Sequence, residues 1–235
     1  MAQHFWRASD YPLGTPPNNI TVFGASTGSI VSDAASPSGF ALQCTRNPGA
    51  ADRGVYFNDF LISSITNEIY VVCRRTEANV AFRSGANEGN PRYTINQTDV
   101  TYSTAASVRS SYFHTLNFSS AYVALRCVLD GITVEADIAP AGTTLVSALR
   151  STYSAAISVS NLYASMSDTA TGTLFLSEIG LGTDGDPAPT GPLGTIEPFI
   201  LRHNPSLNKV IPVLSSPTVT DIGANCVRPR VTKGY

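Results

Sequence analysis

The segment Tyr122–Ile138 reads YVALRCVLDGITVEADI, and its two halves alternate apolar and polar residues on either side of Asp130-Gly131. Such alternation, with a period of two, is the pattern of a strand that buries one face. Asp-Gly tolerates the positive φ angles of a type I′ turn. The segment therefore predicts an antiparallel hairpin. Its buried face would carry Val123, Leu125, Cys127 and Leu129 in the first strand, and Ile132, Val134, Ala136 and Ile138 in the second.

Further strand patterns occur along the first 180 residues. The stretch Ile69–Arg74 alternates in the same way, with Ile69, Val71 and Cys73 on its apolar face. Gly, Pro, Asn and Ser separate these segments, which favours an all-β, antiparallel two-sheet sandwich over βαβ units. One helix is predicted, at Thr143–Ser151, where Leu145, Val146 and Leu149 share a face. Weaker strand patterns are Phe40–Cys44, Val80–Arg83, Arg92–Ile95, Tyr112–Leu116, Ile157–Val159 and Leu174–Ile179.

Composition excludes several classes of function. Of the 235 residues 14% are charged, and 15 basic against 17 acidic residues give a net charge of −2. Nucleic-acid binding and polybasic membrane attachment both require clustered positive charge, so we expect neither. No apolar run reaches the roughly 20 residues that span a bilayer. The opening residues Met1–Arg7 lack the apolar stretch of a signal peptide, so we expect assembly in the cytoplasm, and any exit from a cell by a route other than that signal.

The composition changes after Leu181. Residues 182–192 are rich in Gly, Asp and Pro and predict an extended exit from the sandwich. We therefore expect a sandwich over residues 1–183, and a proline-rich exit with a β-structured assembly arm over 184–235. The arm is too short to enclose a core of its own, so its apolar side chains should pack on another surface. Those assigned to assembly are Phe199, Ile200, Leu201, Val213, Leu214, Val219, Ile222 and Val231.

Two segments resemble a known family. The opening Tyr11-Pro12-Leu13-Gly14-Thr15-Pro16-Pro17 is similar to the start of concanavalin/laminin-G-like sandwich modules of tailed-phage virion proteins. Residues 176–189, LSEIGLGTDGDPAP, resemble the closing strand and exit of those modules. The resemblance implies a jelly-roll-type, concanavalin-like sandwich in a virion, at the tail tip, baseplate or fibre.

The same resemblance implies what the protein contacts. Its partners would be other virion proteins and further copies of itself, with a host-surface polysaccharide as a ligand. One alternative is a capsid decoration protein that uses the sandwich as cement. A second alternative is a glycan-cleaving enzyme on the same fold.

The loop between Arg83 and Tyr93 is the candidate for ligand recognition. It combines Arg83, Asn87, Asn90, Arg92 and Tyr93, which offer charge, amides and an aromatic ring. Loops at the end of a rigid sandwich are common recognition sites. The alternative interpretation is an ordinary solvated loop beside core tyrosines.

Catalytic residues are scarce. Glu135 and Asp137 lie two apart on one strand, as a retaining glycosidase would require. However, solvent exposure of a strand's polar face produces the same pattern, and no aromatic residue is interleaved with the pair. No Gly-x-Ser-x-Gly motif accompanies the three histidines. We therefore predict a protein that is not an enzyme.

Metal and thiol chemistry is equally sparse. Asp184-Gly185-Asp186 is a weak calcium candidate, because two carboxylates flank a turn. We expect no other cofactor. The four cysteines lack zinc-ligand spacing, and Cys73 and Cys127 fall in apolar strand patterns that predict buried free thiols.

Overall fold

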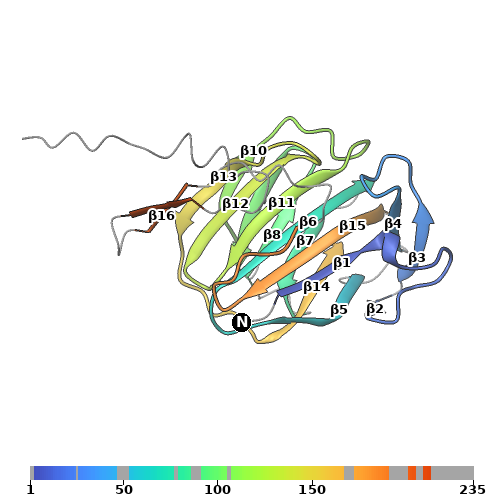
Figure 1. Ribbon diagram of the computed structural model, residues 1–235, viewed down its shortest axis with the longest axis horizontal. Coiled ribbons are helices and arrows are strands. Elements are labelled where there is room, and N and C mark those ends of the chain that lie inside the picture. The colour runs from blue at the N-terminus through green and yellow to red at the C-terminus, as the bar shows by residue number, and fades with distance from the viewer. Residues whose placement is uncertain are drawn as a thin grey trace, which may run out of the picture. The chain divides into compact units, whose positions relative to one another are not determined.

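The computed structural model is almost entirely β-structure (Figure 1). It describes residues 3–24, 26–46, 53–76, 79–85, 91–104, 107–166, 172–190, 201–204 and 209–212. The chain divides into two compact units, Met1–Thr195 and Ile196–Tyr235. The one helical element among the described residues is a 3-10 turn at Ala8–Asp10, and none of their helices is long and apolar enough to cross a membrane.

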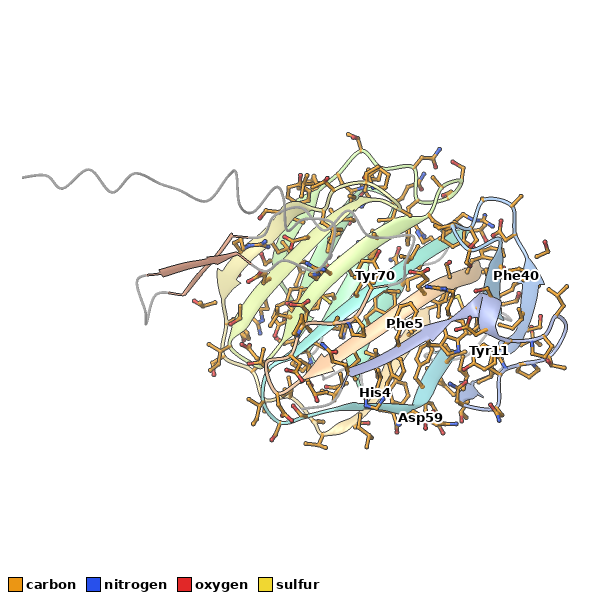
Figure 2. The ribbon with its side chains drawn as sticks, in the orientation of Figure 1. His4, Phe5, Tyr11, Phe40, Asp59 and Tyr70 are labelled. Atoms are coloured by element: carbon orange, nitrogen blue, oxygen red, sulfur yellow. The ribbon has the colours of Figure 1, made fainter. Side chains whose placement is uncertain are left out.

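The first unit is a sandwich of two antiparallel sheets, which confirms the predicted fold class. Sheet A has the order β13-β12-β11-β6-β15-β4-β3, and β1 pairs with the second half of β15. Its strands are β1 (Gln3–Arg7), β3 (Ser26–Ser32), β4 (Phe40–Arg46), β6 (Asn67–Thr76), β11 (Val123–Leu129), β12 (Thr133–Pro140), β13 (Val146–Thr152) and β15 (Gly172–Thr183). The opening strand of the chain thus lies against the closing strand of the sandwich, with Phe5 opposite Gly180 (Figure 2).

Sheet B has the order β10-β9-β8-β7-β14-β5-β2. Its strands are β2 (Ile20–Phe23), β5 (Arg53–Ile62), β7 (Val80–Ser84), β8 (Arg92–Ile95), β9 (Asp99–Thr104), β10 (Ser107–Phe113) and β14 (Ser160–Met166). Because strands close in sequence are distributed over both sheets, folding requires many contacts between distant segments.

The core between the sheets contains the side chains that period-two alternation predicted. In β11 and β12 the inward residues from Val123 to Ile138 are buried, and β6 buries Ile69, Val71 and Cys73. Cys73 and Cys127 are buried free thiols, as predicted, and burial raises the pKa of each. A second apolar cluster lies on the outer face of sheet A around Tyr70 and Val72.

The predicted hairpin at Asp130-Gly131 is present, but its turn differs from a type I′ turn. Gly131 has a φ of +79°, whereas Asp130 has no positive φ. The Asp130 carboxylate instead accepts hydrogen bonds from the backbone N–H groups of Ile132 (2.8 Å) and Thr133 (2.5 Å). Ile132 belongs to this longer turn and is 63% exposed, so its predicted burial is wrong.

Two of the predicted elements are wrong, and a third, the strand Tyr112–Leu116, overlaps β10 only at Tyr112 and Phe113. The expected helix at Thr143–Ser151 is replaced by β13, which pairs with β12 at the edge of sheet A. Three large apolar residues in nine fit either structure, and pairing with β12 outweighs so weak a helical pattern. Residues 157–159 are irregular, and β14 begins only at Ser160.

The proline-rich exit folds back on the sandwich. Gly185 N–H donates to the Thr66 carbonyl (3.1 Å), and Ala188 N–H donates to Glu68 Oε1 (3.2 Å). A Cβ atom on Gly180 would lie 2.0 Å from the Pro189 carbonyl oxygen. Residues 184–190 therefore run along the outer face of sheet A over glycines of β15, in place of the extended exit that their composition predicted.

In the second unit the structure describes the backbone of one hairpin, β16 (Leu201–Asn204) and β17 (Lys209–Pro212). The side chains of the predicted assembly residues lie outside the described part of the chain.

Candidate functional site

Two rows of side chains cross the outer face of sheet B. The registers of β2, β5, β14, β7, β8 and β9 define both rows. One row holds Thr21, Tyr56, Tyr163, Arg83, Arg92 and Ser103, and the other holds Phe23, Gly54, Ser165, Ala81, Thr94 and Thr101. Their strand neighbours, such as Phe57 and Phe82, point the other way into the core.

Three aromatic rings gather at one end of these rows. The Tyr56 and Tyr163 ring centroids lie 5.0 Å apart, and Phe23 lies 5.3 Å from Tyr163 and 6.4 Å from Tyr56. All three side chains are half-buried, and desolvation by burial raises the pKa of Tyr163. We call Phe23, Tyr56 and Tyr163 the aromatic trio. Its rings present apolar surface to solvent while remaining fixed against one another.

Polar groups surround the trio. Thr21 Oγ1 donates to Asn58 Oδ1 (2.9 Å), next to Tyr56. Asn161 Nδ2 donates to the carbonyls of Phe57 and Asn58, both at 3.0 Å, which ties β14 to β5. Ser165 is fully buried in the second row, and its hydroxyl has no hydrogen-bond partner among the residues that the structure describes. The trio thus combines a fixed apolar surface with hydroxyl and amide groups at its margin.

Of the residues predicted for ligand recognition, Arg83 and Arg92 lie side by side in sheet B, whereas Tyr93 points away from them into the core. Arg83 is fully buried in β7, opposite Tyr163, and the half-buried Arg92 lies opposite it in β8. Tyr93 points inward, where its hydroxyl donates to the Val128 carbonyl (2.5 Å), so its assignment to a ligand site is wrong. Asn87 and Asn90 lie outside the described residues.

The carboxylate pair Glu135 and Asp137 lies on the outer face of sheet A. Both carboxylates form ion pairs with Arg150 of the neighbouring strand, at 3.6 Å for Glu135 Oε1 and at shorter range for Asp137. Arg150 Nη1 also donates to the Ala136 carbonyl (2.9 Å), which fixes the guanidinium between the two acids. One guanidinium thus offsets one of the two negative charges of the pair.

The metal candidate Asp184-Gly185-Asp186 forms the turn that begins residues 184–190, which we call the returning segment. Asp184 is exposed and has a φ of +58°, and Asp186 N–H donates to the Thr183 carbonyl (3.1 Å). Within the described ranges, no three His, Cys, Asp or Glu side chains are grouped so as to hold a metal ion. Calcium binding here stays a prediction.

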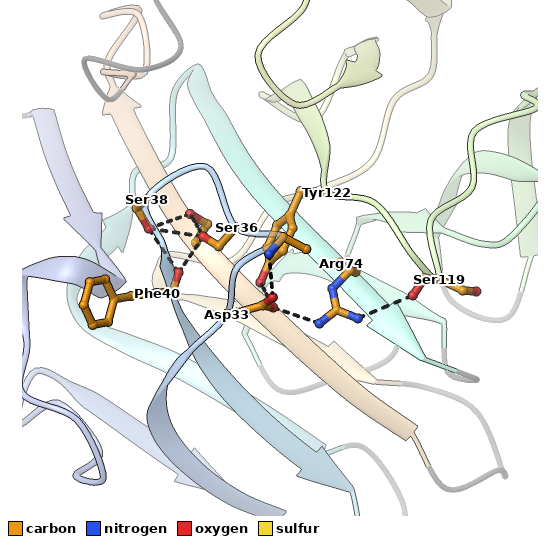
Figure 3. A network of polar contacts seen from close by, with 9 residues as sticks. Asp33, Ser36, Ser38, Phe40, Arg74, Ser119 and Tyr122 are labelled. Atoms are coloured by element: carbon orange, nitrogen blue, oxygen red, sulfur yellow. Dashed lines mark hydrogen bonds and ion pairs between the residues drawn. The ribbon is translucent and has the colours of Figure 1, made fainter.

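A polar network on the other sheet has a structural role. The Asp33 carboxylate accepts hydrogen bonds from Arg74 Nη2 (2.8 Å), the Tyr122 hydroxyl (2.7 Å) and the Ala35 N–H (3.0 Å) (Figure 3). Arg74 also lies 4.0 Å over the Phe175 ring. The network fastens the β3–β4 turn to β6 and to the loop before β11.

Sequence reasoning missed the aromatic trio. Its members lie in three strands that are far apart in the chain, and β2 and β5 were not predicted. A local signal exists at Val55-Tyr56-Phe57, where Tyr56 occupies the outward position between two core residues.

Comparison with known proteins identifies the architecture. No family model and no curated protein matches the sequence. Among solved structures, lectin II from Ulex europaeus is similar, with a TM-score of 0.51, 7% identity and coverage of 77% of this chain and 97% of that one. The chain has a lectin-type sandwich fold.

Two further structures agree with this fold. A basic winged bean lectin with Tn-antigen gives a TM-score of 0.50 at 7% identity, covering 77% of this chain and 98% of the lectin. A protein of unknown function from Shewanella oneidensis MR-1 gives 0.53 at 12% identity, covering 76% and 84%. Identities this low establish the fold alone.

Proposed function

We propose that the sandwich binds a host-surface polysaccharide through the outer face of sheet B. The observation that carries this proposal is the half-buried aromatic trio, Phe23, Tyr56 and Tyr163. The C–H face of a sugar ring stacks on aromatic rings, which supply a large apolar contact in fixed geometry. Side-chain hydroxyls and amides such as those of Thr21 and Asn58 then orient the sugar hydroxyls.

The fold supports a carbohydrate ligand over a nucleic acid. Two of the similar structures are plant lectins, and one of them is the winged bean lectin with Tn-antigen. Proteins that stack nucleic-acid bases on aromatic rings also follow the phosphates with a basic groove. The net charge of −2 does not favour that ligand.

Binding would proceed without cleavage of the glycan. The paired acids of β12 both contact Arg150, and its guanidinium is also held by the Ala136 carbonyl, so it occupies the space beside the two carboxylates. A retaining glycosidase needs both carboxyls free to flank the scissile glycosidic bond. The Arg150 contacts therefore support a binding role over the glycan-cleaving alternative.

A place in a phage virion is part of the same proposal. It rests on the likeness of residues 176–189 to the closing strand and exit of tailed-phage sandwich modules. The closing strand β15 and the returning segment occupy these residues. Labelled antibody on purified particles would distinguish a tail position from the capsid position of the decoration alternative.

Binding is tested with the full chain and a panel of bacterial surface polysaccharides. We expect Tyr163→Ala and Tyr56→Ala each to lower affinity for the bound glycan about 5- to 150-fold, since loss of one stacked ring costs roughly 1–3 kcal/mol. Phe5→Ala is the matched control, because Phe5 is a partly exposed aromatic on the outer face of sheet A. Equal affinity for the trio variants and the wild type would exclude this face as the binding site.

A further inference from the structure

Four connecting segments meet at one end of the sandwich. They are residues 63–66, 130–132, 153–159 and 184–186. Backbone hydrogen bonds join them in pairs: Gly185 N–H donates to Thr66 O (3.1 Å), and Ala155 N–H donates to Gly131 O (2.7 Å). Asn67 Nδ2 bonds the carbonyls of Ile65 (3.0 Å) and Leu129 (3.0 Å), which holds the first two segments together. We call this surface the turn end.

The turn end exposes large apolar side chains. Ile65 is 60% exposed, Ile132 63% and Val159 66%, and Leu61 at the adjoining end of β5 is 56% exposed. Four of the nine exposed large hydrophobics of the described chain thus lie at this one end. Apolar side chains gathered in this way, rather than scattered singly, indicate an interaction surface.

The charge at the turn end has one sign. Its four segments include Asp130, Asp184 and Asp186 but no lysine or arginine. Asp184 is exposed, and the other two are half-buried. A partner for this surface should therefore be apolar and basic.

The C-terminal arm of the chain has this chemistry. Residues 196–235 contain five basic residues (Arg202, Lys209, Arg228, Arg230 and Lys233) and two acidic ones, for a net charge of +3. Residues 1–195 then carry the other 10 basic and 15 acidic residues, for a net charge of −5, and the two values sum to −2. The arm also contains apolar residues such as Val213 and Leu214, which match the exposed apolar side chains of the turn end.

We infer that the turn end receives the C-terminal arm of a second copy of this chain. The contact joins two different surfaces of the same protein, so it is head-to-tail. Such contacts close into rings or continue as filaments, depending on the rotation between copies. An arm of 40 residues is long enough to supply the 20–30 interface residues per side that are typical of stable interfaces.

The oligomeric state of the full chain tests this inference. Light scattering after gel filtration should give the wild type a mass of at least two 24.8 kDa chains. The double variant Ile65→Arg/Val159→Arg adds positive charge to the turn end and should run as a monomer with an unchanged melting temperature. Leu13→Arg is the control, because Leu13 is 56% exposed but lies outside the turn end, and it should keep the wild-type mass.

A mixing experiment separates head-to-tail contact from other assemblies. A second variant, Arg202→Glu/Arg228→Glu/Arg230→Glu, keeps the turn end and reverses charge on the arm, so it should also be monomeric. Mixing the two variants unites one intact turn end with one intact arm and should restore a complex of two chains. Higher salt should weaken that complex, because screening acts on exposed charge pairs.

Three results would overturn the inference. The first is a wild type that stays monomeric from 100-fold below to 100-fold above a protein concentration of about 10 µM. The second is an oligomer that persists in Ile65→Arg/Val159→Arg, and the third is a mixture of the two variants that forms no complex. A monomeric wild type whose melting temperature falls in both variants would indicate that the arm packs within its own chain. Glycan binding is measured separately, so these results leave the proposed function untouched.

Discussion

The hydroxyl of Tyr93 in sheet B donates a 2.5 Å hydrogen bond to the carbonyl of Val128 in sheet A. The same oxygen accepts the N–H of Glu135 at 3.1 Å, so one side chain connects β8 to both β11 and β12 across the core. Its ring packs 5.2 Å from that of Tyr102. Burial raises the pKa of Tyr93, which keeps the donating proton in place throughout the physiological range.

Tyr93→Phe should destabilise the sandwich without changing ligand affinity. The substitution leaves the part-buried Val128 carbonyl and Glu135 N–H without this partner, at a cost of roughly 1–3 kcal/mol in the free energy of unfolding. Chemical denaturation measures that loss. Tyr102→Phe is the control, since the structure shows no hydrogen bond from Tyr102 among the described residues, and it should cost under ~1 kcal/mol. If Tyr93→Phe is as stable as the wild type but binds the glycan more weakly, Tyr93 belongs to the binding site.

The Asp33 network should make stability depend on pH in the acid range. Burial alone would raise the pKa of Asp33, but hydrogen bonds from Arg74 and Tyr122 outweigh it and hold the pKa below its ordinary value. Folding therefore gains from the charged form above the unfolded pKa of about 3.9. That gain is lost as the pH falls through the lower pKa of the folded protein.

Asp33→Asn measures this contribution. At pH 7 it should lower the free energy of unfolding by roughly 1.5–3 kcal/mol, because hydrogen bonds to a charged group are lost. The difference between wild type and variant should shrink as the wild-type carboxyl is protonated. Asp59→Asn, at an exposed position, should show no such convergence. A constant difference from pH 7 to pH 2 would contradict the assigned role of Asp33.

Gly180→Ala should detach the returning segment from sheet A. The new Cβ would lie 2.0 Å from the Pro189 carbonyl oxygen, so the backbone of β15 or of residues 184–190 must move, at a cost of roughly 1–3 kcal/mol. Limited proteolysis should then cleave within residues 184–190 faster than in the wild type.

Gly142→Ala provides a comparison. Gly142 has a φ of +81°, and a Cβ atom added there would meet no other heavy atom of the described chain within 4 Å. The substitution should therefore lower the free energy of unfolding only by the backbone strain at a positive φ angle, about 1 kcal/mol. Its proteolysis pattern should match that of the wild type. Unchanged cleavage in Gly180→Ala would show that residues 184–190 are not held on β15.

Glu135→Gln/Asp137→Asn should leave glycan affinity unchanged within about twofold, because the acids lie on the sheet opposite the aromatic trio. The measurement is binding by calorimetry, together with release of reducing ends from the bound polysaccharide. Hydrolysis by the wild type that disappears in the double variant would overturn the non-enzymatic proposal.

The sequence by itself determined the core faces of several strands and the position of one turn, because these depend on residues that are close together along the chain. Period-two alternation identified the core faces of β6, β11 and β12, because successive side chains of any strand point to opposite sides. The burial of Cys73 and Cys127 followed from the same rule. The turn at Asp130 was located correctly, although its form depended on Ala155, which donates to the Gly131 carbonyl from the next connection.

The order of strands in the two sheets decided where the candidate site residues lie. Arg83 and Tyr93 were predicted to flank a recognition loop, but both side chains are fully buried, and Tyr93 packs in the core between the sheets. Phe23, Tyr56 and Tyr163 come together only because β2, β5 and β14 are adjacent in sheet B. Likewise, Gly180 must lack a side chain only because residues 184–190 fold back and place the Pro189 carbonyl next to it. Alternation along the sequence predicts which residues share a face of one strand. Which side chains that face contacts is determined by pairing between distant strands, because that pairing depends on the packing of the whole core.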